Sequence, residues 1–261
     1  IFDQPRAISD SLLGRIEREN NRVVFPELSM ASSDLKRIKR IVFTACGTAS
    51  YACLVGKYFV EKFARIPCEV DYASEFRYRD PVLDKDTLVV AVSQSGETAD
   101  TLGAIELAAK SAQTLAICNV LGSSISRKVG NVIFTHAGPE ISVASTKAFT
   151  TQLTVLYLFA LFLAQERSGS AVDSQLLTDL VELPASIEEA IKVDAEVQRI
   201  AKEYHQARDF LFLGRGMCYP VALEGALKLK ELSYIHAEGY PAGEMKHGPI
   251  ALIDEHMPVV V

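Results

Sequence analysis

Residues 88–110 of this 261-residue chain read LVVAVSQSGETADTLGAIELAAK. The apolar run at 88–92 is short and rich in valine, which is typical of a strand buried on both faces of a parallel sheet. Residues 99–110 carry apolar side chains at roughly helical spacing, so they predict a helix. A tight turn that contains Gly96 joins the two. The stretch therefore predicts one strand–turn–helix unit of an α/β fold.

The turn itself has the composition of an anion site. Backbone N–H groups at a helix N-terminus point outward, and the helix dipole favours negative charge there. Ser93, Ser95 and Thr98 add three hydroxyl donors, and Gln94 adds an amide. A single Ser or Thr before a helix is commonly a plain N-cap. Three hydroxyls after a buried strand favour a phosphate site, and the absence of Lys and Arg from the turn favours a single phosphate ester over a polyphosphate.

Strands and helices alternate on both sides of this unit. Further strands are predicted at 39–45, 68–70, 112–119 and 131–135, and helices at 49–64, 123–128 and 147–165. This alternation predicts a parallel sheet covered by helices on both faces. Ligands bind such sheets outside the carboxyl ends of the strands. Three turns lead into helices: those at 46–48 and 93–98 follow predicted strands, and that at 143–146 follows a loop.

The remaining segments are read more coarsely. Residues 4–18 predict a helix, 20–33 a loop, and 73–79 a polar connection. Two helices are expected at 174–181 and 186–205, the second with Ser186 as its N-cap, before a strand at 209–213. The apolar run at 153–164 is too short to span a bilayer and is interpreted as a buried core helix.

The chain matches itself weakly after a shift of 169 positions. Four identities follow without a gap: Gly47 with Gly216, Gly56 with Gly225, Ala73 with Ala242, and Glu75 with Glu244. Val92, at the end of the strand before the hydroxyl-rich turn, falls on the last residue, Val261. A sheet cut there would leave a strand edge unpaired. We therefore expect a fragment of a longer chain whose missing part completes a second domain.

Composition excludes several classes of function. The net charge of −6 argues against a nucleic-acid partner. The five cysteines are scattered, which is typical of reduced thiols in a cytoplasmic protein. The histidines lack metal-ligand spacing, so no metal and no cofactor are expected. No signal peptide is predicted, and no membrane partner is expected.

A second cluster of chemical groups lies on a helix predicted at 220–235. Glu224, Lys228 and Glu231 are spaced so that they share one helix face. This stripe is either a solvated, salt-bridged surface or, if shielded from water by its leucine neighbours, a proton shuttle. His247 lies in a turn, where its ordinary pKa would suit acid–base work without proving it.

Five blocks of sequence carry a resemblance to a known family. They are ACGT (45–48), SQSGET (93–98), VASTKAF (143–149), LEGALKLKE (223–231) and GEMKHGP (243–249). Together with Gln4-Pro5-Arg6 they resemble the isomerase half of glucosamine-6-phosphate synthases, the glutamine–fructose-6-phosphate aminotransferases (isomerizing). The resemblance covers nearly the whole chain. It implies tandem sugar-isomerase (SIS) domains, each a three-layer α/β/α sandwich on a parallel flavodoxin-like sheet, with the second copy incomplete.

The resemblance also implies domain bounds and a reaction. The expected division is an N-terminal helix and linker (1–34), a first SIS domain (35–168), linking helices (169–206) and the start of a second SIS domain (207–261). The implied reaction converts fructose 6-phosphate and ammonia to glucosamine 6-phosphate for UDP-N-acetylglucosamine synthesis. A cytoplasmic homodimer is the implied assembly.

The family's functional residues transfer position by position. Ser93, Gln94, Ser95 and Thr98 would hold the phosphate, and Glu231 would move the proton between C1 and C2, supported by Lys228. His247 from the partner subunit would help to open the sugar ring. The sugar would be lined by residues of two turns: Cys46, Gly47 and Thr48, and Val143, Ala144 and Ser145.

Three departures limit the expected activity. Ala49 stands where many members have serine, and the glutaminase domain and the C-terminal tail with its Schiff-base lysine are absent. We expect weak binding of fructose 6-phosphate or its product, and no synthesis from glutamine. The main alternative is an SIS-type regulatory module that senses sugar phosphates without catalysis.

Two other enzyme classes fit poorly. A dinucleotide fingerprint at Gly214-Arg215-Gly216 fails because Tyr219 stands at the third glycine position. The Gly-x-Ser-x-Gly elbow of serine hydrolases is missing at Ser93 and Ser95.

Overall fold

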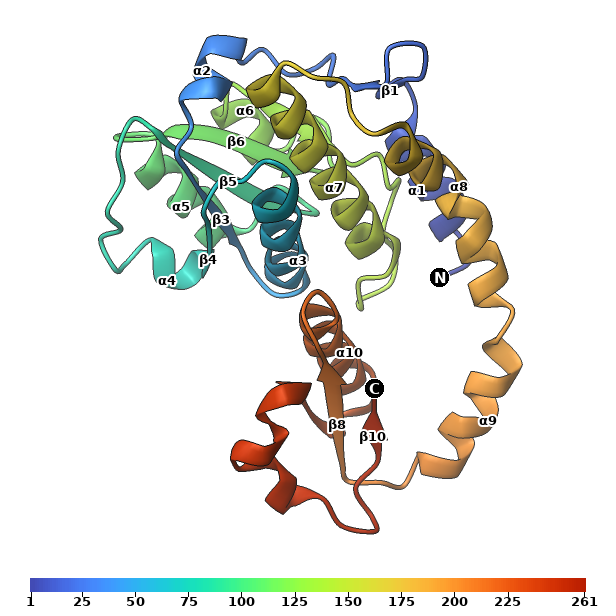
Figure 1. Cartoon of the computed structure of the whole chain (residues 1–261). Helices are drawn as coiled ribbons and strands as arrows, with labels where there is room; N and C mark the ends of the chain where they lie inside the picture. Colours follow the sequence, from blue (N-terminus) through green and yellow to red (C-terminus); the bar gives the residue numbers. More distant parts are fainter. The chain divides into compact units, whose positions relative to one another are not determined.

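The computed structural model describes all 261 residues (Figure 1). The chain divides into two compact units, the first formed by Ile1–Ile141 and Thr146–Ser186, the second by Ser142–Ser145 and Ile187–Val261. Each unit is an α/β structure built on its own parallel sheet.

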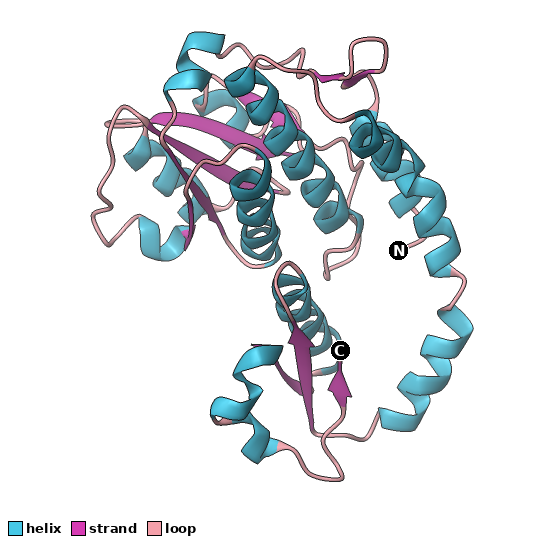
Figure 2. Ribbon diagram, viewed as in Figure 1, coloured by secondary structure: helices cyan, strands magenta, loops and turns pink.

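The first unit contains a five-stranded sheet in the order β4-β3-β5-β6-β7 (Figure 2). All neighbouring strands are parallel. The strands are β3 (Arg40–Ala45), β4 (Cys68–Tyr72), β5 (Thr87–Ser93), β6 (Gln113–Cys118) and β7 (Val132–Phe134). Counted along the chain this is the order 2-1-3-4-5 of flavodoxin-like sheets, which confirms the predicted fold class. Every residue of β5 is buried, as the valine-rich run predicted.

Helices cover both faces of this sheet (Figure 1). On one face α3 (Thr48–Phe63) packs against α7 (Lys147–Ser168), which also contacts α1 (Gln4–Leu12) and α2 (Ser32–Arg37). On the other face lie α4 (Ala73–Phe76), α5 (Ala99–Ala108) and α6 (Ser124–Lys128). Their apolar side chains form one core with alternate residues of the strands, among them Val42, Val89 and Ala91. The two faces confirm the three-layer sandwich.

The core helix α7 is the one helix long and apolar enough to cross a membrane by length and composition. In the folded unit, however, 72% of its most apolar window is buried. Val155, Leu156 and Phe159 have no exposed surface. The helix is therefore the buried core helix that the run at 153–164 predicted.

The second unit repeats the start of the first. Its strands β8 (Asp209–Gly214), β9 (His236–Pro241) and β10 (Val259–Val260) are parallel in the order β10-β8-β9. Helix α10 (Cys218–Ser233) follows β8, and two short 3-10 helices, η1 (Ala242–His247) and η2 (Pro249–Leu252), follow β9. Strand β8 coincides with β3 after the predicted shift of 169 residues, so the internal repeat is confirmed.

Several predicted boundaries were wrong. The helix expected at 4–18 ends at Leu12, because Leu13 leaves the helical region with a ψ of 124° and Gly14 follows with a φ of +72°. The chain then forms a hairpin of β1 (Ile16–Glu17) and β2 (Arg22–Val23), partly inside the expected loop. The polar stretch 73–79 begins with α4, whose Phe76 is fully buried.

The two linking helices also divide at a different place. Helix α8 (Ser174–Ile191) continues past Pro184, and α9 (Asp194–Tyr204) begins only after Val193. Ser186 therefore lies inside α8, and it is not the N-cap that its neighbouring glutamates suggested.

Candidate functional site

The hydroxyl-rich turn lies at the point where the strand order of the first unit reverses. Strands β3 and β5 are hydrogen-bonded neighbours, with Thr44 opposite Ala91. The turn at 46–48 leaves the carboxyl end of β3, and the turn at 93–98 leaves the carboxyl end of β5. The helix after β3 (α3) and the helix after β5 (α5) lie on opposite faces of the sheet. At such a point α/β sheets have a crevice in which ligands bind.

Hydrogen bonds within the second turn set the direction of its hydroxyls. Ser93 Oγ accepts the Gly96 amide at 3.0 Å, and Ser95 Oγ accepts the Glu97 amide at 3.2 Å. Each hydroxyl uses a lone pair and keeps its own proton to donate. Thr98 is the N-cap of α5, yet its hydroxyl makes no capping bond. These donors and the amides of the first turn of α5 can together bind an anion.

Gly96 allows this turn to approach the neighbouring strand closely. Its φ is +68°, and a Cβ atom there would lie 2.4 Å from Ser123 Oγ and 2.7 Å from Cys118 Sγ. Real side chains do not tolerate such distances, so the position requires glycine for both conformation and space.

The turn after β3 is joined to α5 on the other side of the crevice. Thr101 Oγ1 of α5 donates to Cys46 Sγ at 3.8 Å. Gly47 has a φ of +55°, and Thr48 begins α3. Ser50 Oγ donates to the Gly47 carbonyl at 2.6 Å and fixes the turn. The structure therefore brings the turn at 46–48 and the turn at 93–98 together at one edge of the sheet.

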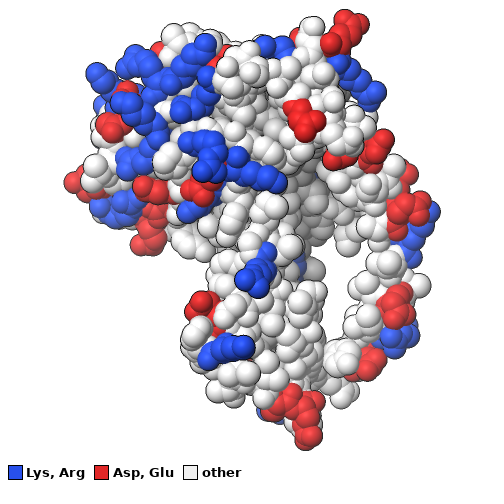
Figure 3. Space-filling view, viewed as in Figure 1, with Lys and Arg blue, Asp and Glu red and all other residues white.

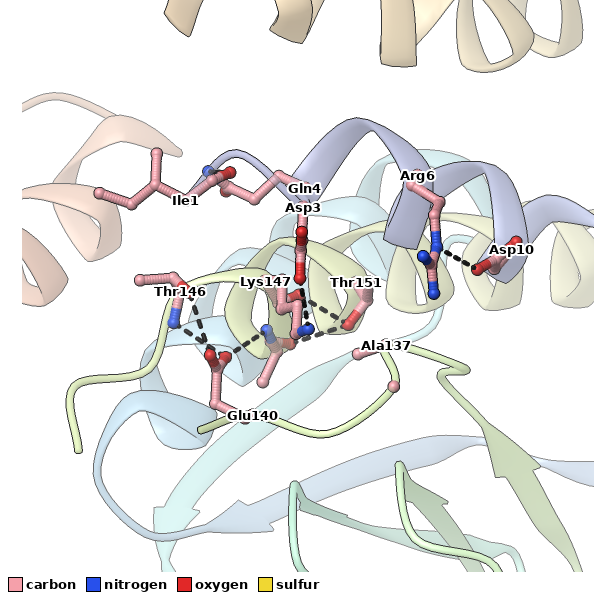
Figure 4. Close-up of polar contacts among 12 residues, drawn as sticks. Ile1, Asp3, Gln4, Arg6, Asp10, Ala137, Glu140, Thr146, Lys147 and Thr151 are labelled. Atoms are coloured by element: carbon pink, nitrogen blue, oxygen red, sulfur yellow. Dashed lines mark hydrogen bonds and ion pairs between the residues drawn. The ribbon is translucent and has the colours of Figure 1, made fainter. Parts of the chain in front are cut away.

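The loop that contains Val143, Ala144 and Ser145 is fixed at its return into α7 by Glu140 (Figure 4). The Glu140 carboxylate accepts the Thr146 amide at 3.0 Å, the Thr146 hydroxyl at 3.1 Å and the Ala148 amide at 2.9 Å. Val143 is 96% exposed, whereas Ala144 is buried. The sequence does not indicate this role for Glu140, because Glu140 lies six residues before Thr146 and a capping box spans only three.

Replacing Glu140 by alanine is expected to destabilise the first unit by about 1 kcal/mol, because the substitution removes acceptors for two amides at the start of α7. Urea unfolding at neutral pH, followed by a probe in the first unit, would measure the change. Glu182→Ala is the control, since Glu182 lies inside α8 and accepts a bond only at its backbone carbonyl. Equal stability of the two variants would contradict the capping role.

The second unit presents the carboxylate–lysine stripe on α10. Lys228 Nζ lies 2.6 Å from Glu231 Oε2 and 3.3 Å from Glu224 Oε1. The side chains of Lys228 and Glu224 are 19% and 7% exposed, and that of Glu231 is 34% exposed. The stripe is therefore partly shielded from water and is not a fully solvated surface. The Lys228 ammonium holds Glu231 Oε2, and Glu231 Oε1 takes no part in that ion pair.

His247 ends η1 and is exposed. The following residue, Gly248, has a φ of +129°, which turns the chain sharply into η2. The structure places His247, Lys228 and Glu231 in the second unit, apart in sequence from the two turns of the first unit.

In the view of Figure 3, Lys and Arg side chains gather over part of the first unit, with acidic side chains among them. Several basic residues of the first unit are paired, for example Lys39 with Asp86 at 2.7 Å and Arg40 with Glu69 at 3.5 Å. These pairs neutralise part of the basic surface that Figure 3 shows.

The chain matches the SIS domain family over residues 34–162 and 203–261. It is 54% identical over 265 residues to the glutamine–fructose-6-phosphate aminotransferase (isomerizing) of Bacteroides thetaiotaomicron, and 53% identical over 264 residues to that of Thermus thermophilus. Each match covers 100% of this chain but only 43% of the relative.

Solved structures agree with these relatives. The C-terminal domain of glucosamine-fructose-6-phosphate aminotransferase from Francisella tularensis superposes with a TM-score of 0.92 at 42% identity, over 99% of this chain and 72% of that one. A second solved structure is that of a protein from Silicibacter pomeroyi assigned as a phosphosugar isomerase. It superposes with a TM-score of 0.77 at 28% identity, over 98% of this chain and 74% of that one. The chain therefore belongs to the SIS domain family and corresponds to the isomerase region of the glutamine–fructose-6-phosphate aminotransferases.

Proposed function

We propose that the chain forms the sugar-phosphate-binding and isomerising part of a glucosamine-6-phosphate synthase, acting in the pathway to UDP-N-acetylglucosamine. In this reaction ammonia replaces the C2 carbonyl oxygen of fructose 6-phosphate, and proton transfer converts the imine to an aldose amine, glucosamine 6-phosphate. The observation that carries the proposal is the hydroxyl-lined turn Ser93–Gln94–Ser95–Gly96–Glu97–Thr98 at the switch point of the sheet.

The proposed binding roles are those that the family resemblance implies, and the hydrogen bonds of the turns at 46–48 and 93–98 support them. Ser93, Ser95 and Thr98 donate hydroxyl protons to the phosphate, and Gln94 adds its amide. Thr48 lines the sugar together with Cys46 and Gly47 in the same turn. Val143, Ala144 and Ser145 are proposed to line the sugar as well, held by the bonds of Glu140 to Thr146 and Ala148.

The proposed proton transfer uses α10. Glu231 takes a proton from C1 through one carboxylate oxygen and returns it to C2, because one carboxylate can serve both steps. Lys228 holds the other oxygen at 2.6 Å and so orients the base. His247, from the partner subunit of a homodimer, assists ring opening.

The remaining assignments belong to the same proposal. The first SIS domain is proposed at 35–168 and the second from 207, with 1–34 and 169–206 as connecting segments. A cytoplasmic location follows from the metabolic reaction, and neither nucleic acid nor membrane is a proposed partner. Titration with fructose 6-phosphate, followed by the amide signals of residues 93–98, tests the proposal. Binding that left those signals unchanged would overturn it.

Thr98→Ala is expected to weaken fructose 6-phosphate binding by about tenfold, since a hydrogen bond to a charged group contributes about 1.5 kcal/mol or more. Thr98→Ser keeps the hydroxyl and is expected to bind within about twofold of the unchanged chain. Isothermal titration calorimetry measures both. A loss in Thr98→Ser as large as that in Thr98→Ala would show that the hydroxyl is not the contact.

A further inference from the structure

The hydroxyl-rich turn contains an acidic residue, Glu97, in the middle of an anion site. A carboxylate beside a phosphate repels it, so its charge alone would weaken binding. In the structure the side chain is engaged elsewhere: Glu97 Oε1 accepts the backbone amide of Ser124, the first residue of α6, at 2.7 Å. Hydrogen bonding from Ser124, by its side chain and its backbone amide, lowers the pKa of the Glu97 carboxyl.

Two backbone bonds join the same two segments. The Asn119 amide donates to the Gln94 carbonyl at 3.3 Å, and the Ile125 amide donates to the Gly96 carbonyl at 3.0 Å. The turn at 94–97 is therefore attached at three points to residues 119–125, which run from the end of β6 into the first turn of α6. Of the three, only the bond of Glu97 depends on a side chain, so it is the one that a substitution can remove.

The attachment bears directly on the phosphate donors. The Glu97 amide donates to Ser95 Oγ at 3.2 Å, and Thr98 follows as the N-cap of α5. Fixing Glu97 therefore fixes the residue between two of the three proposed hydroxyl donors. A prepositioned donor loses less conformational entropy when the ligand binds.

We infer that Glu97 is a positioning residue of the phosphate site, which holds Ser95 and Thr98 in their binding conformation through its bond to the Ser124 amide. This inference rests on the proposed function for the identity of the ligand. It requires that the gain from positioning exceed the repulsion between the Glu97 carboxylate and the phosphate.

The two effects have opposite signs, so substitutions separate them. Glu97→Ala removes both the charge and the acceptor, and is expected to weaken phosphate binding by about tenfold. Glu97→Gln removes the charge but keeps an acceptor oxygen for Ser124, and is expected to bind as tightly as the unchanged chain or more tightly. If Glu97 acted only through its charge, both variants would bind more tightly.

Ser124→Pro tests the same bond from its other end. Proline is favoured at the first position of a helix, and Ser123 before it is extended with a ψ of 164°, so the fold tolerates the change. The substitution removes both the amide and the hydroxyl of Ser124 and leaves the Glu97 charge in place. It is expected to match the loss in Glu97→Ala. Glu106→Ala is the control, since Glu106 is an exposed carboxylate that pairs with Lys128 at the other end of α6.

The experiment titrates each variant with inorganic phosphate and, separately, with fructose 6-phosphate, following ³¹P resonances, after thermal unfolding has shown that each is folded. The inference is supported if Glu97→Ala and Ser124→Pro lose affinity for both ligands while Glu97→Gln and Glu106→Ala do not. It is overturned if Glu97→Ala binds phosphate as well as Glu97→Gln does. An unchanged chain that binds phosphate but not the sugar ester would refute the proposed substrate, and the phosphate series would still decide the role of Glu97. An unchanged chain that binds neither would overturn both.

Discussion

Glu231→Gln is expected to lower the rate of isomerisation by about 10³-fold, within the range that a general base contributes. Glutamine has nearly the shape of glutamate but cannot accept the proton from C1. It can still accept a hydrogen bond from Lys228, whose Nζ lies 2.6 Å from Glu231 Oε2. Substrate affinity is therefore expected to stay within about twofold, so that the loss falls on the chemical step.

The measurement needs a chain that spans the length of its relatives, because this one covers 43% of the Bacteroides thetaiotaomicron aminotransferase. A chimera in which residues 1–261 replace the matching segment of that relative provides it. Formation of glucosamine 6-phosphate from fructose 6-phosphate and ammonia gives the rate, and calorimetry gives the affinity.

Glu255→Gln is the matched control for the charge, since the Glu255 side chain is 87% exposed. A Glu231→Gln chimera that keeps its rate would exclude Glu231 as the base. It would also favour the alternative in which the SIS fold senses sugar phosphates without catalysis. A chimera that loses affinity and rate together would place Glu231 in binding instead of proton transfer.

Sequence alone predicted most of the first unit, because its signals are local and agree with one another. The valine-rich run at 88–92 needed burial on both faces, and β5 is buried along its whole length. The shift of 169 residues predicted β8 from β3 because both copies keep the same spacing between strand, glycine turn and helix.

The errors fall where tertiary packing decides against a local signal. Ser186 and the glutamates after it suggested the start of a new helix, yet α8 continues to Ile191. The two helices are in fact separated at Lys192 and Val193. Neither residue is glycine or proline, so the local sequence does not indicate a helix end there. Phe76 lies in a polar stretch, but its burial against the α4 and α5 side of the sheet makes that stretch helical.

The site was predictable in composition but not in its attachments. Three hydroxyls after a strand indicate an anion site because the chemistry lies in consecutive residues. The bonds from Glu97 to Ser124 and from Glu140 to Thr146 join residues that no short motif relates. The contact of Glu97 with Ser124 depends on the pairing of β5 with β6, and that of Glu140 with Thr146 depends on how the loop before α7 folds back on itself.

Gly96→Ala is expected to destabilise the first unit by about 2–4 kcal/mol and to abolish measurable phosphate binding. About 1 kcal/mol or more follows from the left-handed conformation, since φ is +68° and a Cβ atom is disfavoured there. The rest follows from overpacking, because that Cβ would lie 2.4 Å from Ser123 Oγ and 2.7 Å from Cys118 Sγ. Cys118 lies in β6 and is fully buried, so the turn and not the strand must move.

Gly122→Ala separates the cost of the left-handed backbone conformation from the cost of overpacking. Gly122 has a φ of +70°, nearly that of Gly96, but a Cβ atom there would meet nothing within 4 Å. Its substitution is therefore expected to cost only the conformational part, about 1 kcal/mol, and to leave phosphate binding unchanged. Urea unfolding and ³¹P titration of both variants measure the difference. Equal losses in the two variants would mean that backbone conformation alone demands glycine at 96. A larger loss confined to Gly96→Ala would show that close packing of the turn against Ser123 and Cys118 keeps the phosphate donors in place.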